Sequence, residues 1–320
     1  MAEDARKKFQ TYLFFLRHFD RAIRVGRDHR SVGHLVNTLV TEQQALLAGI
    51  NPVQLDDAAV DRIRKLLFNG WNSETVARIN SLFDLEVRAI TNHWKPIQTY
   101  YALYFLLAAV QGIHTPARRP GHEVTLRFAT QSVNQRFPTP WCCHYDFEAA
   151  TCHRFPWATL PSVNSGWNLA NHTDPYVFVG HFYRTTGLEK RYERWLEHAK
   201  GKKHKAGHPR AGKRILIREV SAGIIGCWDV LWRMRKWVNY KEAQALLEGQ
   251  DFLPYVEEFD DALNSILTMS AAAVEHLLYA LIGDGLMTRM YEDYLRVTAG
   301  KVDCSALRLR REIICGLPAG

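Results

Sequence analysis

The chain has 320 residues, and its 41 lysine and arginine residues against 33 aspartate and glutamate residues leave a formal net charge of +8. This length permits one large buried core or two modest ones, and the moderate positive charge favours contact with polyanions such as nucleic acid. Residues 1–8 are polar and charged, and the longest apolar run, residues 100–110, is well short of the roughly twenty residues of a membrane span. We therefore expect a cytoplasmic protein with reduced thiols, no secretory leader and no transmembrane segment.

Helix follows helix in the N-terminal part of the chain. Ser31 is a predicted N-cap for a helix that ends at Gly49. Asp56 or Asp57 begins the next helix, which we expect to stop at Gly70, because glycine is a common residue just past a helix end.

A further helix is predicted from Asn72 onward, because apolar side chains recur there at helical spacing. They are Val76, Ile79, Leu82, Phe83, Leu85 and Ile90. This stripe is that of an amphipathic helix whose apolar face packs on the core. Pro96 fits the first turn of the following helix, residues 97–111, which is apolar nearly all round. That helix should be the central one of a unit that covers residues 1–113.

Residues 114–218 change character, because prolines at positions 116, 120, 138, 140, 156, 161 and 175 interrupt every periodic run. We expect a long irregular insertion that holds a small β element. Short strands are predicted at residues 123–128 and 176–182, where β-branched and aromatic residues alternate with others. The insertion ends in a charge run, residues 190–218, with eleven lysine or arginine residues and two glutamates. We expect parts of that run to be disordered.

Helical periodicity returns in residues 219–320. One helix carries Trp228 and Trp232, and the next, residues 259–281, ends at Gly283. The short connection at residues 251–254 predicts that the two helices are antiparallel neighbours. We expect them to form one compact unit with the N-terminal helices.

Two segments resemble known families. Residues 94–104, Trp-Lys-Pro-Ile-Gln-Thr-Tyr-Tyr-Ala-Leu-Tyr, resemble a helix of YaaC-like proteins in which a proline precedes a tyrosine pair. Residues 233–243, Arg-Met-Arg-Lys-Trp-Val-Asn-Tyr-Lys-Glu-Ala, are similar to a helix start in HEPN-type domains. The resemblance implies a helical bundle of the kind used by ribonuclease toxins, nucleotide-binding modules and antiviral defence proteins. Members that cleave RNA carry an arginine followed four to six residues later by a histidine, usually at a dimer interface, so a homodimer is implied.

The catalytic pair of such ribonucleases is not kept after Arg235, because Asn239 and Tyr240 stand where the histidine is needed and neither transfers protons near neutral pH. Three other pairs have the spacing: Arg24 with His29, Arg88 with His93, and Arg191 with His198. Arg88 and His93 are the best placed, since they precede the helix with the tyrosine pair. His93 would move a proton and Arg88 would stabilise the phosphorane. The alternative is that His93 is a cation at a helix C-terminus and Arg88 belongs to a surface ion pair.

A thiol and imidazole cluster lies in the insertion. It comprises Cys142, Cys143, His144, Cys152 and His153. These ligand types can close a tetrahedral zinc site, although the spacing matches no standard finger. The aromatic neighbours favour cysteines that are packed as small hydrophobes. We therefore assign no metal and no cofactor, and the zinc alternative stays open.

Cations of the charge run are candidates for contact with a nucleic-acid backbone, because flexible lysine and arginine side chains bind phosphate without reading bases. The candidate binding residues are Lys202, Lys203, Lys205, Arg210, Lys213 and Arg214, with Arg233, Arg235, Asn239 and Tyr240 lining a site between helices. The alternative for the charge run is a solvated loop. RNA is the expected ligand ahead of DNA.

The sequence thus predicts a mainly α protein, a HEPN-like bundle with a long insertion. No phosphate-binding glycine loop, serine-hydrolase elbow, zinc-protease motif or dinucleotide fingerprint is present. The resemblance implies an RNA-binding effector of a bacterial antiviral or toxin system, in which cleavage would be metal-independent and a partner protein would be encoded nearby. The alternative is a non-catalytic scaffold or sensor that docks on a partner protein or nucleic acid.

Overall fold

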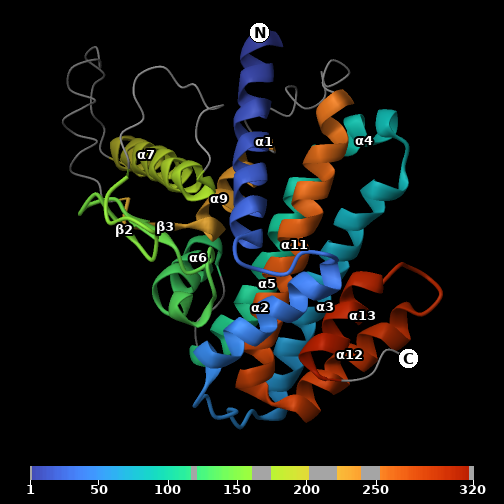
Figure 1. Ribbon diagram of the computed structural model, residues 1–320. Coiled ribbons are helices and arrows are strands. Elements are labelled where there is room, and N and C mark those ends of the chain that lie inside the picture. The colour runs from blue at the N-terminus through green and yellow to red at the C-terminus, as the bar shows by residue number, and fades with distance from the viewer. Residues whose placement is uncertain (1, 117–120, 161–173, 202–221, 239–252, 317–320) are drawn as a thin grey trace.

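The computed structural model describes residues 2–116, 121–160, 174–201, 222–238 and 253–316 (Figure 1). In these ranges the protein is mainly α, as predicted, with eleven α-helices, two 3-10 turns and one three-stranded sheet. The helices are α1 (Ala2–Arg24), α2 (Val32–Leu47), α3 (Asp57–Ile79), α4 (Leu85–Thr91), α5 (Lys95–His114), α6 (His122–Gln131), α7 (Pro175–Gly201), α9 (Cys227–Lys236), α11 (Leu253–Ile282), α12 (Asp284–Thr298) and α13 (Ser305–Ile314). The turns are η1 (Asn80–Leu82) and η2 (Asn134–Arg136), and the strands are β1 (His144–Asp146), β2 (Thr151–His153) and β3 (Ile224–Gly226).

Local capping explains several helix boundaries. The Ser31 hydroxyl accepts a hydrogen bond from the backbone N–H of His34 at 3.2 Å and starts α2. The Asp56 carboxylate accepts one from the backbone N–H of Ala59 at 2.7 Å and starts α3. Gly283 ends α11 with a φ of +81°, a left-handed conformation that other residues rarely adopt. These three predictions are confirmed.

The central helix is α5, as predicted, and it packs between α3 and α11 (Figure 1). Pro96 lies in its first turn, where no backbone N–H is needed. The predicted stop at Gly70 is wrong, because α3 continues to Ile79. A Cβ at Gly70 would come within 3.1 Å of the Ala102 carbonyl oxygen, so this glycine permits α3 to approach α5 closely.

The helix predicted from Asn72 is also wrong in its extent and in its packing. Its first residues belong to α3, and the chain then turns through η1 into the short helix α4. The predicted apolar stripe does not pack on the core. Its six side chains are all exposed, at Val76, Ile79, Leu82, Phe83, Leu85 and Ile90.

The insertion is more helical than predicted. Residues 123–128 belong to α6 and residues 176–182 to α7, so both predicted strands are wrong. Their buried side chains follow helical spacing, as with Leu126 and Ala129 in α6. The charge run is helical as far as Gly201, and residues 202–218 lie outside the described ranges.

The small β element predicted for the insertion is formed by other residues. Its strands are antiparallel in the order β2-β1-β3, and Tyr145 of β1 lies opposite Cys152 of β2 and Ile225 of β3. Because β3 leads directly into α9, the sheet joins the insertion to the C-terminal helices. Helix α9 packs chiefly on α5 and α7, whereas α11 has α5, α2 and α1 as its main neighbours. The predicted antiparallel pairing of these two helices is therefore not a main contact of the fold.

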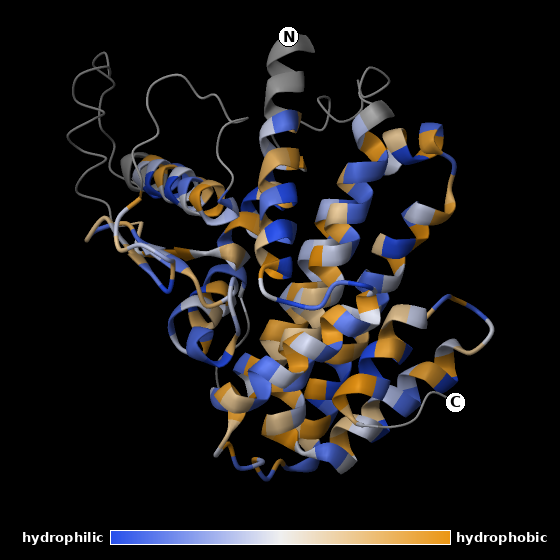
Figure 2. Ribbon diagram, viewed as in Figure 1, coloured by the Kyte–Doolittle hydropathy of each residue, from blue (hydrophilic) through white to orange (hydrophobic). Residues whose placement is uncertain are grey.

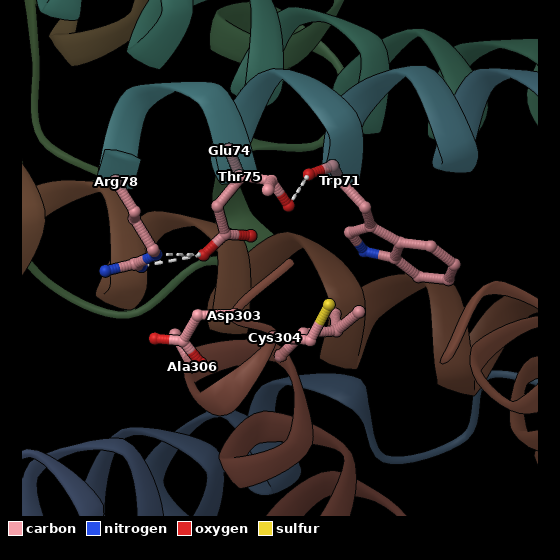
Figure 3. A pocket seen from close by; sticks show the side chains of 8 residues that line it. Trp71, Glu74, Thr75, Arg78, Asp303, Cys304 and Ala306 are labelled. Atoms are coloured by element: carbon pink, nitrogen blue, oxygen red, sulfur yellow. Dashed lines mark hydrogen bonds and ion pairs between the residues drawn. The ribbon is translucent and has the colours of Figure 1, made fainter. Parts of the chain in front are cut away.

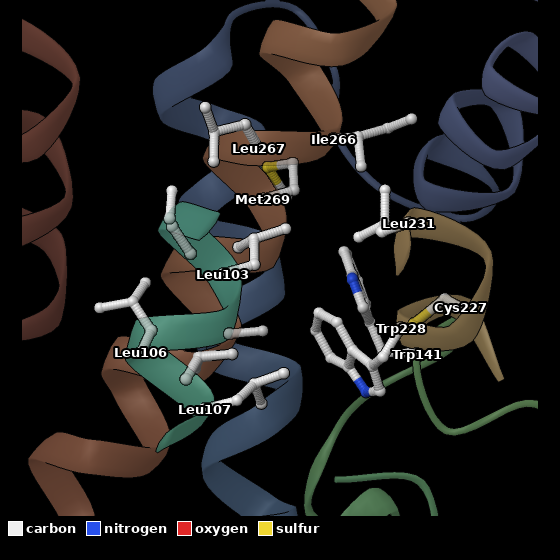
Figure 4. Packing of buried hydrophobic residues seen from close by; sticks show 14 of the residues in the cluster. Leu103, Leu106, Leu107, Trp141, Cys227, Trp228, Leu231, Ile266, Leu267 and Met269 are labelled. Atoms are coloured by element: carbon white, nitrogen blue, oxygen red, sulfur yellow. The ribbon is translucent and has the colours of Figure 1, made fainter. Parts of the chain in front are cut away.

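Helix α11 is long and apolar enough to cross a bilayer by length and composition alone. Its candidate span, Tyr255–Ile282, has 83% of its apolar window buried inside the protein. Figure 4 shows Ile266, Leu267 and Met269 of this helix facing apolar residues of α5 and α9. This burial is typical of the core helix of a folded protein.

A buried ionic network ties α13 to α3 and α11. The Arg310 guanidinium, fully buried, donates to the Glu74 carboxylate at 2.6 and 2.7 Å and to the Glu275 carboxylate at 2.7 and 2.9 Å. The indole N–H of Trp71 and the hydroxyl of Tyr291 also donate hydrogen bonds to the Glu275 carboxylate. A cavity of only about 10 Å³ adjoins this network, with room for little more than a water molecule (Figure 3). The charged groups of this network find their hydrogen-bond partners within it, so we assign it a structural role.

His276 of α11 provides a pH-dependent contribution to stability. Gln43 donates both amide hydrogens to the carbonyls of Arg136 and Ala273, at 3.0 and 2.9 Å, so its oxygen accepts from Nδ1 of His276 at 3.3 Å. Burial lowers the pKa of His276 to about 4 from 6.5.

Because the unfolded chain binds a proton at His276 in a range where the folded protein does not, stability is lost as pH falls from about 6.5 towards 4. We expect this residue to reduce the unfolding free energy by about 2 kcal/mol between pH 7 and pH 5. Urea unfolding of wild type and His276→Gln at both pH values measures it. An equal pH dependence in both proteins would contradict the prediction.

Candidate functional site

Arg88 and His93, the predicted catalytic pair, make separate contacts with the backbone. The Arg88 guanidinium donates to the carbonyl oxygens of Phe83 and Ser81, each at 2.7 Å, and so closes the turn before α4. Nδ1 of His93 lies 2.7 Å from the carbonyl oxygen of Ile90. Both side chains therefore have structural roles at the two ends of α4. Their catalytic assignment stays a prediction that no contact between them supports.

Arg233 and Arg235, two residues apart on α9, face different neighbours. Arg233 donates to the hydroxyls of Thr185 and Thr186 at 3.0 and 3.1 Å, and its Nε lies 2.5 Å from the Glu189 carboxylate. These contacts place it in the packing of α9 against α7. Arg233 therefore has a structural role, whereas Arg235 points towards α5.

Arg235 is the centre of the candidate site. Its guanidinium carbon lies 5.3 Å from the ring centroid of Tyr100 and 5.3 Å from that of Tyr101, both on α5. The side chain is buried, at 8% exposure, yet Nε and Nη1 have no hydrogen-bond partner in the described part of the chain. A buried cation with two unsatisfied donors is costly, and an anion that reached Nε and Nη1 would satisfy them.

His122, the first residue of α6, completes the site. Its Nδ1 lies 2.7 Å from the Tyr100 hydroxyl, and its ring packs on Tyr104 with centroids 4.4 Å apart. Because His122 and Arg235 both contact Tyr100 and Tyr101, the tyrosine pair holds them beside each other. We name this set, Arg235, His122, Tyr100, Tyr101 and Tyr104, the arginine–tyrosine site.

Electrostatics at the arginine–tyrosine site favour a neutral imidazole. Burial, and then the charge of Arg235, lower the pKa of His122 below its ordinary value. Burial raises the pKa of Tyr100, which Arg235 opposes, and burial raises that of Tyr104. At neutral pH the site therefore holds one cation, one neutral imidazole and protonated phenols. A guanidinium and a neutral imidazole are the groups needed to bind a phosphate and to move a proton. In the tautomer whose Nδ1–H donates to the Tyr100 hydroxyl, Nε2 of His122 is the nitrogen that can accept a proton.

A cavity of about 90 Å³ lies between α6, α7 and α9, and no residue of the arginine–tyrosine site is among those that line it. Its lining residues are Glu123, Leu126, Lys190, Glu193, Arg194, Trp232 and Lys236. The cations are matched by carboxylates: Lys190 pairs with Asp229, Arg194 with Glu123, and Lys236 with Glu193. With its charges balanced in this way, the cavity has little attraction for an anion by itself.

The cluster of cysteines and histidines does not form a metal site among the described residues. The His144 and His153 rings stack with centroids 4.6 Å apart, and the Cys143 thiol donates to the carbonyl oxygen of Arg154 at 3.0 Å. The hydrogen-bonding interaction with Cys143 holds the pKa of Cys142 below its ordinary value, against the effect of burial. All three cysteines of the cluster are buried, as expected for cysteines that pack as small hydrophobes.

His122 was missed by the sequence reasoning because it is far from Arg235 along the chain and directly precedes a segment, residues 123–128, that we predicted as a strand. Both the tyrosine pair and Arg235 were named from the sequence, but in two different segments, each of which resembles a different family. Eight predicted binding residues lie outside the described ranges: Lys202, Lys203, Lys205, Arg210, Lys213, Arg214, Asn239 and Tyr240. Comparison of the chain with protein-family models, with curated proteins and with solved structures finds no match.

Proposed function

We propose that the protein is a cytoplasmic RNA-binding effector of the HEPN-like kind, and that the arginine–tyrosine site is where it holds an RNA phosphate. The observation that carries the proposal is Arg235, a buried guanidinium with two donors that lack partners among the described residues. Guanidinium donors match phosphate oxygens in geometry and charge. Tyr101, half-buried beside Arg235, offers an aromatic face on which an unpaired base can stack.

Metal-independent cleavage at this site would use His122 as the proton acceptor. In such a reaction the ribose 2′-hydroxyl loses its proton to the imidazole and its oxygen bonds to the adjacent phosphorus. The bond from phosphorus to the 5′-oxygen breaks, the 5′-oxygen takes a proton from water, and a 2′,3′-cyclic phosphate is left. Arg235 would stabilise the negative charge that develops on the phosphorane oxygens. His122 and Arg235 are distant in sequence. They would take the two roles, proton transfer and charge stabilisation, that a closely spaced arginine and histidine have in the RNA-cleaving members of the family that the sequence resembles.

The basic segment that follows α7 supports the binding part of the proposal. Lys202, Lys203, Lys205, Arg210, Lys213 and Arg214 add positive charge to a chain whose formal net charge is already +8. Such residues would contact the RNA backbone away from the cleavage point, and neutralising three of them should reduce the salt dependence of binding by roughly three counterions. A non-cleaving RNA sensor is the alternative, in which the same site binds without turnover.

The test is a gel assay with labelled single-stranded RNA, transfer RNA and DNA in EDTA, at low and high salt. We expect His122→Ala to reduce cleavage about a hundredfold or more while binding persists, because general base catalysis contributes at least that much. Arg235→Ala should weaken binding itself. His153→Ala, an exposed histidine on β2, is the matched control and should behave as wild type.

The outcomes separate the candidate sites. Cleavage lost in His93→Ala but kept in His122→Ala would return the catalytic role to Arg88 and His93. Binding without cleavage, weakened by Arg235→Ala, would support the sensor alternative. Binding that no Arg235 variant alters would contradict the proposed site.

A further inference from the structure

Helix α4 buries the small residue Ala89 and leaves its larger apolar residues exposed. The inward side belongs to a buried polar cluster in which Lys95 pairs with Asp260, and Asn80 donates to Asn92 at 2.7 Å. Thr91 at the end of α4 also hydrogen bonds to Asn80. These contacts determine which way the helix faces, since turning it over would remove buried polar groups from their partners.

The outer surface of this segment is apolar. We define the α4 face as Leu82, Phe83, Leu85, Val87, Ile90 and Trp94, whose side chains are between 37% and 74% exposed. Figure 2 shows hydrophobic residues on α4 and on the turn that leads into it, at the outside of the molecule. Contiguous exposed apolar residues of this kind commonly mark an interaction surface in a soluble protein.

Acidic side chains surround the α4 face. Asp84 and Glu86 are exposed at the start of α4, and Glu257 and Asp261 are exposed on α11, which packs on α4. Burial, with the charges of Asp260 and Glu257, raises the pKa of Asp261 although Arg88 and Lys95 act in the opposite direction. These carboxylates place negative charge at the margins of the face, which Arg88 of α4 partly offsets, in a chain whose formal net charge is +8.

We propose that the α4 face is a docking site for an amphipathic helix of another protein that carries apolar residues along one side and lysine or arginine residues at its margins. The apolar side would cover Leu82, Ile90 and Trp94, and the basic margins would meet Glu86 and Glu257. A second copy of this chain is a poorer fit, because two identical acidic margins would face each other across a two-fold axis. An anionic membrane is repelled for the same reason. The site is distinct from the arginine–tyrosine site and does not rest on the proposed function.

The test uses a fluorescent amphipathic peptide of about 18 leucine and lysine residues, long enough to be helical when bound. Its counterpart has glutamate in place of lysine. Fluorescence anisotropy with the whole protein should show binding of the lysine peptide and at least about tenfold weaker binding of the glutamate peptide. Because the formal net charge of the protein is +8, general electrostatic attraction predicts the opposite order.

Surface variants assign the binding to the α4 face. The double variant Leu82→Gln, Ile90→Gln should weaken binding of the lysine peptide about tenfold or more. The control double variant Val25→Gln, Val297→Gln, at similarly exposed apolar residues elsewhere, should leave that binding unchanged. The double variant Glu86→Lys, Glu257→Lys should also weaken binding of the lysine peptide. The double variant Asp57→Lys, Glu312→Lys makes the same change in charge elsewhere and is the control. Circular dichroism melting shows whether each variant is folded.

Three outcomes would overturn the proposal. The first is equal binding of the two peptides, or no binding. The second is a concentration-dependent dimer, measured by light scattering, that is lost in Leu82→Gln with Ile90→Gln, which would assign the face to a second copy. The third is binding to zwitterionic phosphatidylcholine vesicles that the same variant abolishes, which would assign it to a lipid surface.

Discussion

Replacing Arg310 by methionine is expected to reduce the free energy of unfolding by about 3–5 kcal/mol. The guanidinium is the shared partner of Glu74 and Glu275, both nearly or completely inaccessible to solvent. Burial by itself would raise the pKa of Glu74, but the charges of Arg310 and then Arg78 hold it at about 2. Without Arg310, two buried carboxylates are left with far less compensating charge.

The pH dependence gives this prediction a second readout. In wild type, Glu74 has a lowered pKa, so its stabilising contribution is present above its unfolded pKa and is lost as pH falls towards about 2. In Arg310→Met, protonation of the buried carboxylates at lower pH removes charge that has lost its partner. The difference in unfolding free energy between variant and wild type should therefore shrink from pH 7 to pH 4. Urea unfolding measures both.

Arg296→Met is the control for Arg310→Met. It breaks an ion pair with Asp293 in which the arginine is 78% exposed, and should cost less than about 1 kcal/mol. A similarly small effect of Arg310→Met would show that the network contributes little to stability.

Asp260→Ala is the second change with a large expected effect, about 3 kcal/mol of lost stability at pH 7. Lys95 is completely buried, and Asp260 is its ionic partner, with the Ser81 hydroxyl accepting at 3.1 Å. Burial lowers the pKa of Lys95 to about 8, an effect that Asp260 opposes. Removing Asp260 leaves an ammonium that must either stay charged without its counterion or release its proton.

The cost of Asp260→Ala should therefore fall as pH rises from 7 to 9, opposite to the trend expected for Arg310→Met. The reason is that a neutral amine needs no counterion, whereas an isolated carboxylate is relieved by acid. Hydrogen exchange of the α4 amides should also accelerate, since the cluster holds that helix.

Asp261→Ala changes the neighbouring, exposed carboxylate and is the matched control for Asp260→Ala. It should alter stability by less than about 0.5 kcal/mol. If the two variants behave alike, Lys95 and Asp260 do not act as a buried pair.

Much of the fold could be predicted where a local pattern decides the structure. The caps at Ser31 and Asp56 were found because a short polar side chain at a helix start bonds the nearest free N–H. The central place of α5 followed from side chains that are apolar all round. In contrast, residues 123–128 and 176–182 were predicted as strands because short apolar runs fit either periodicity.

The candidate site shows where local patterns stop being informative. Arg235 and the tyrosine pair were visible in the sequence, but His122 joins them only because α6 packs against α5 and α9. Four residues of the α4 face were predicted to belong to a core stripe for a related reason: Leu82, Phe83, Leu85 and Ile90. The spacing of apolar residues shows that a helix has an apolar face and does not show whether that face is buried. Here the tertiary contacts of Asn80, Lys95 and Asp260 determine which face of α4 points inward.

The sequence by itself determined that this chain is a mainly helical protein with a central apolar helix, because propensity, capping and periodicity act over a few residues and can be read locally. Only the tertiary structure decided which charges are buried together, which arginine lacks partners among the described residues, and which apolar residues remain outside. Those properties depend on contacts between residues far apart in the sequence, and such contacts form only when the helices pack.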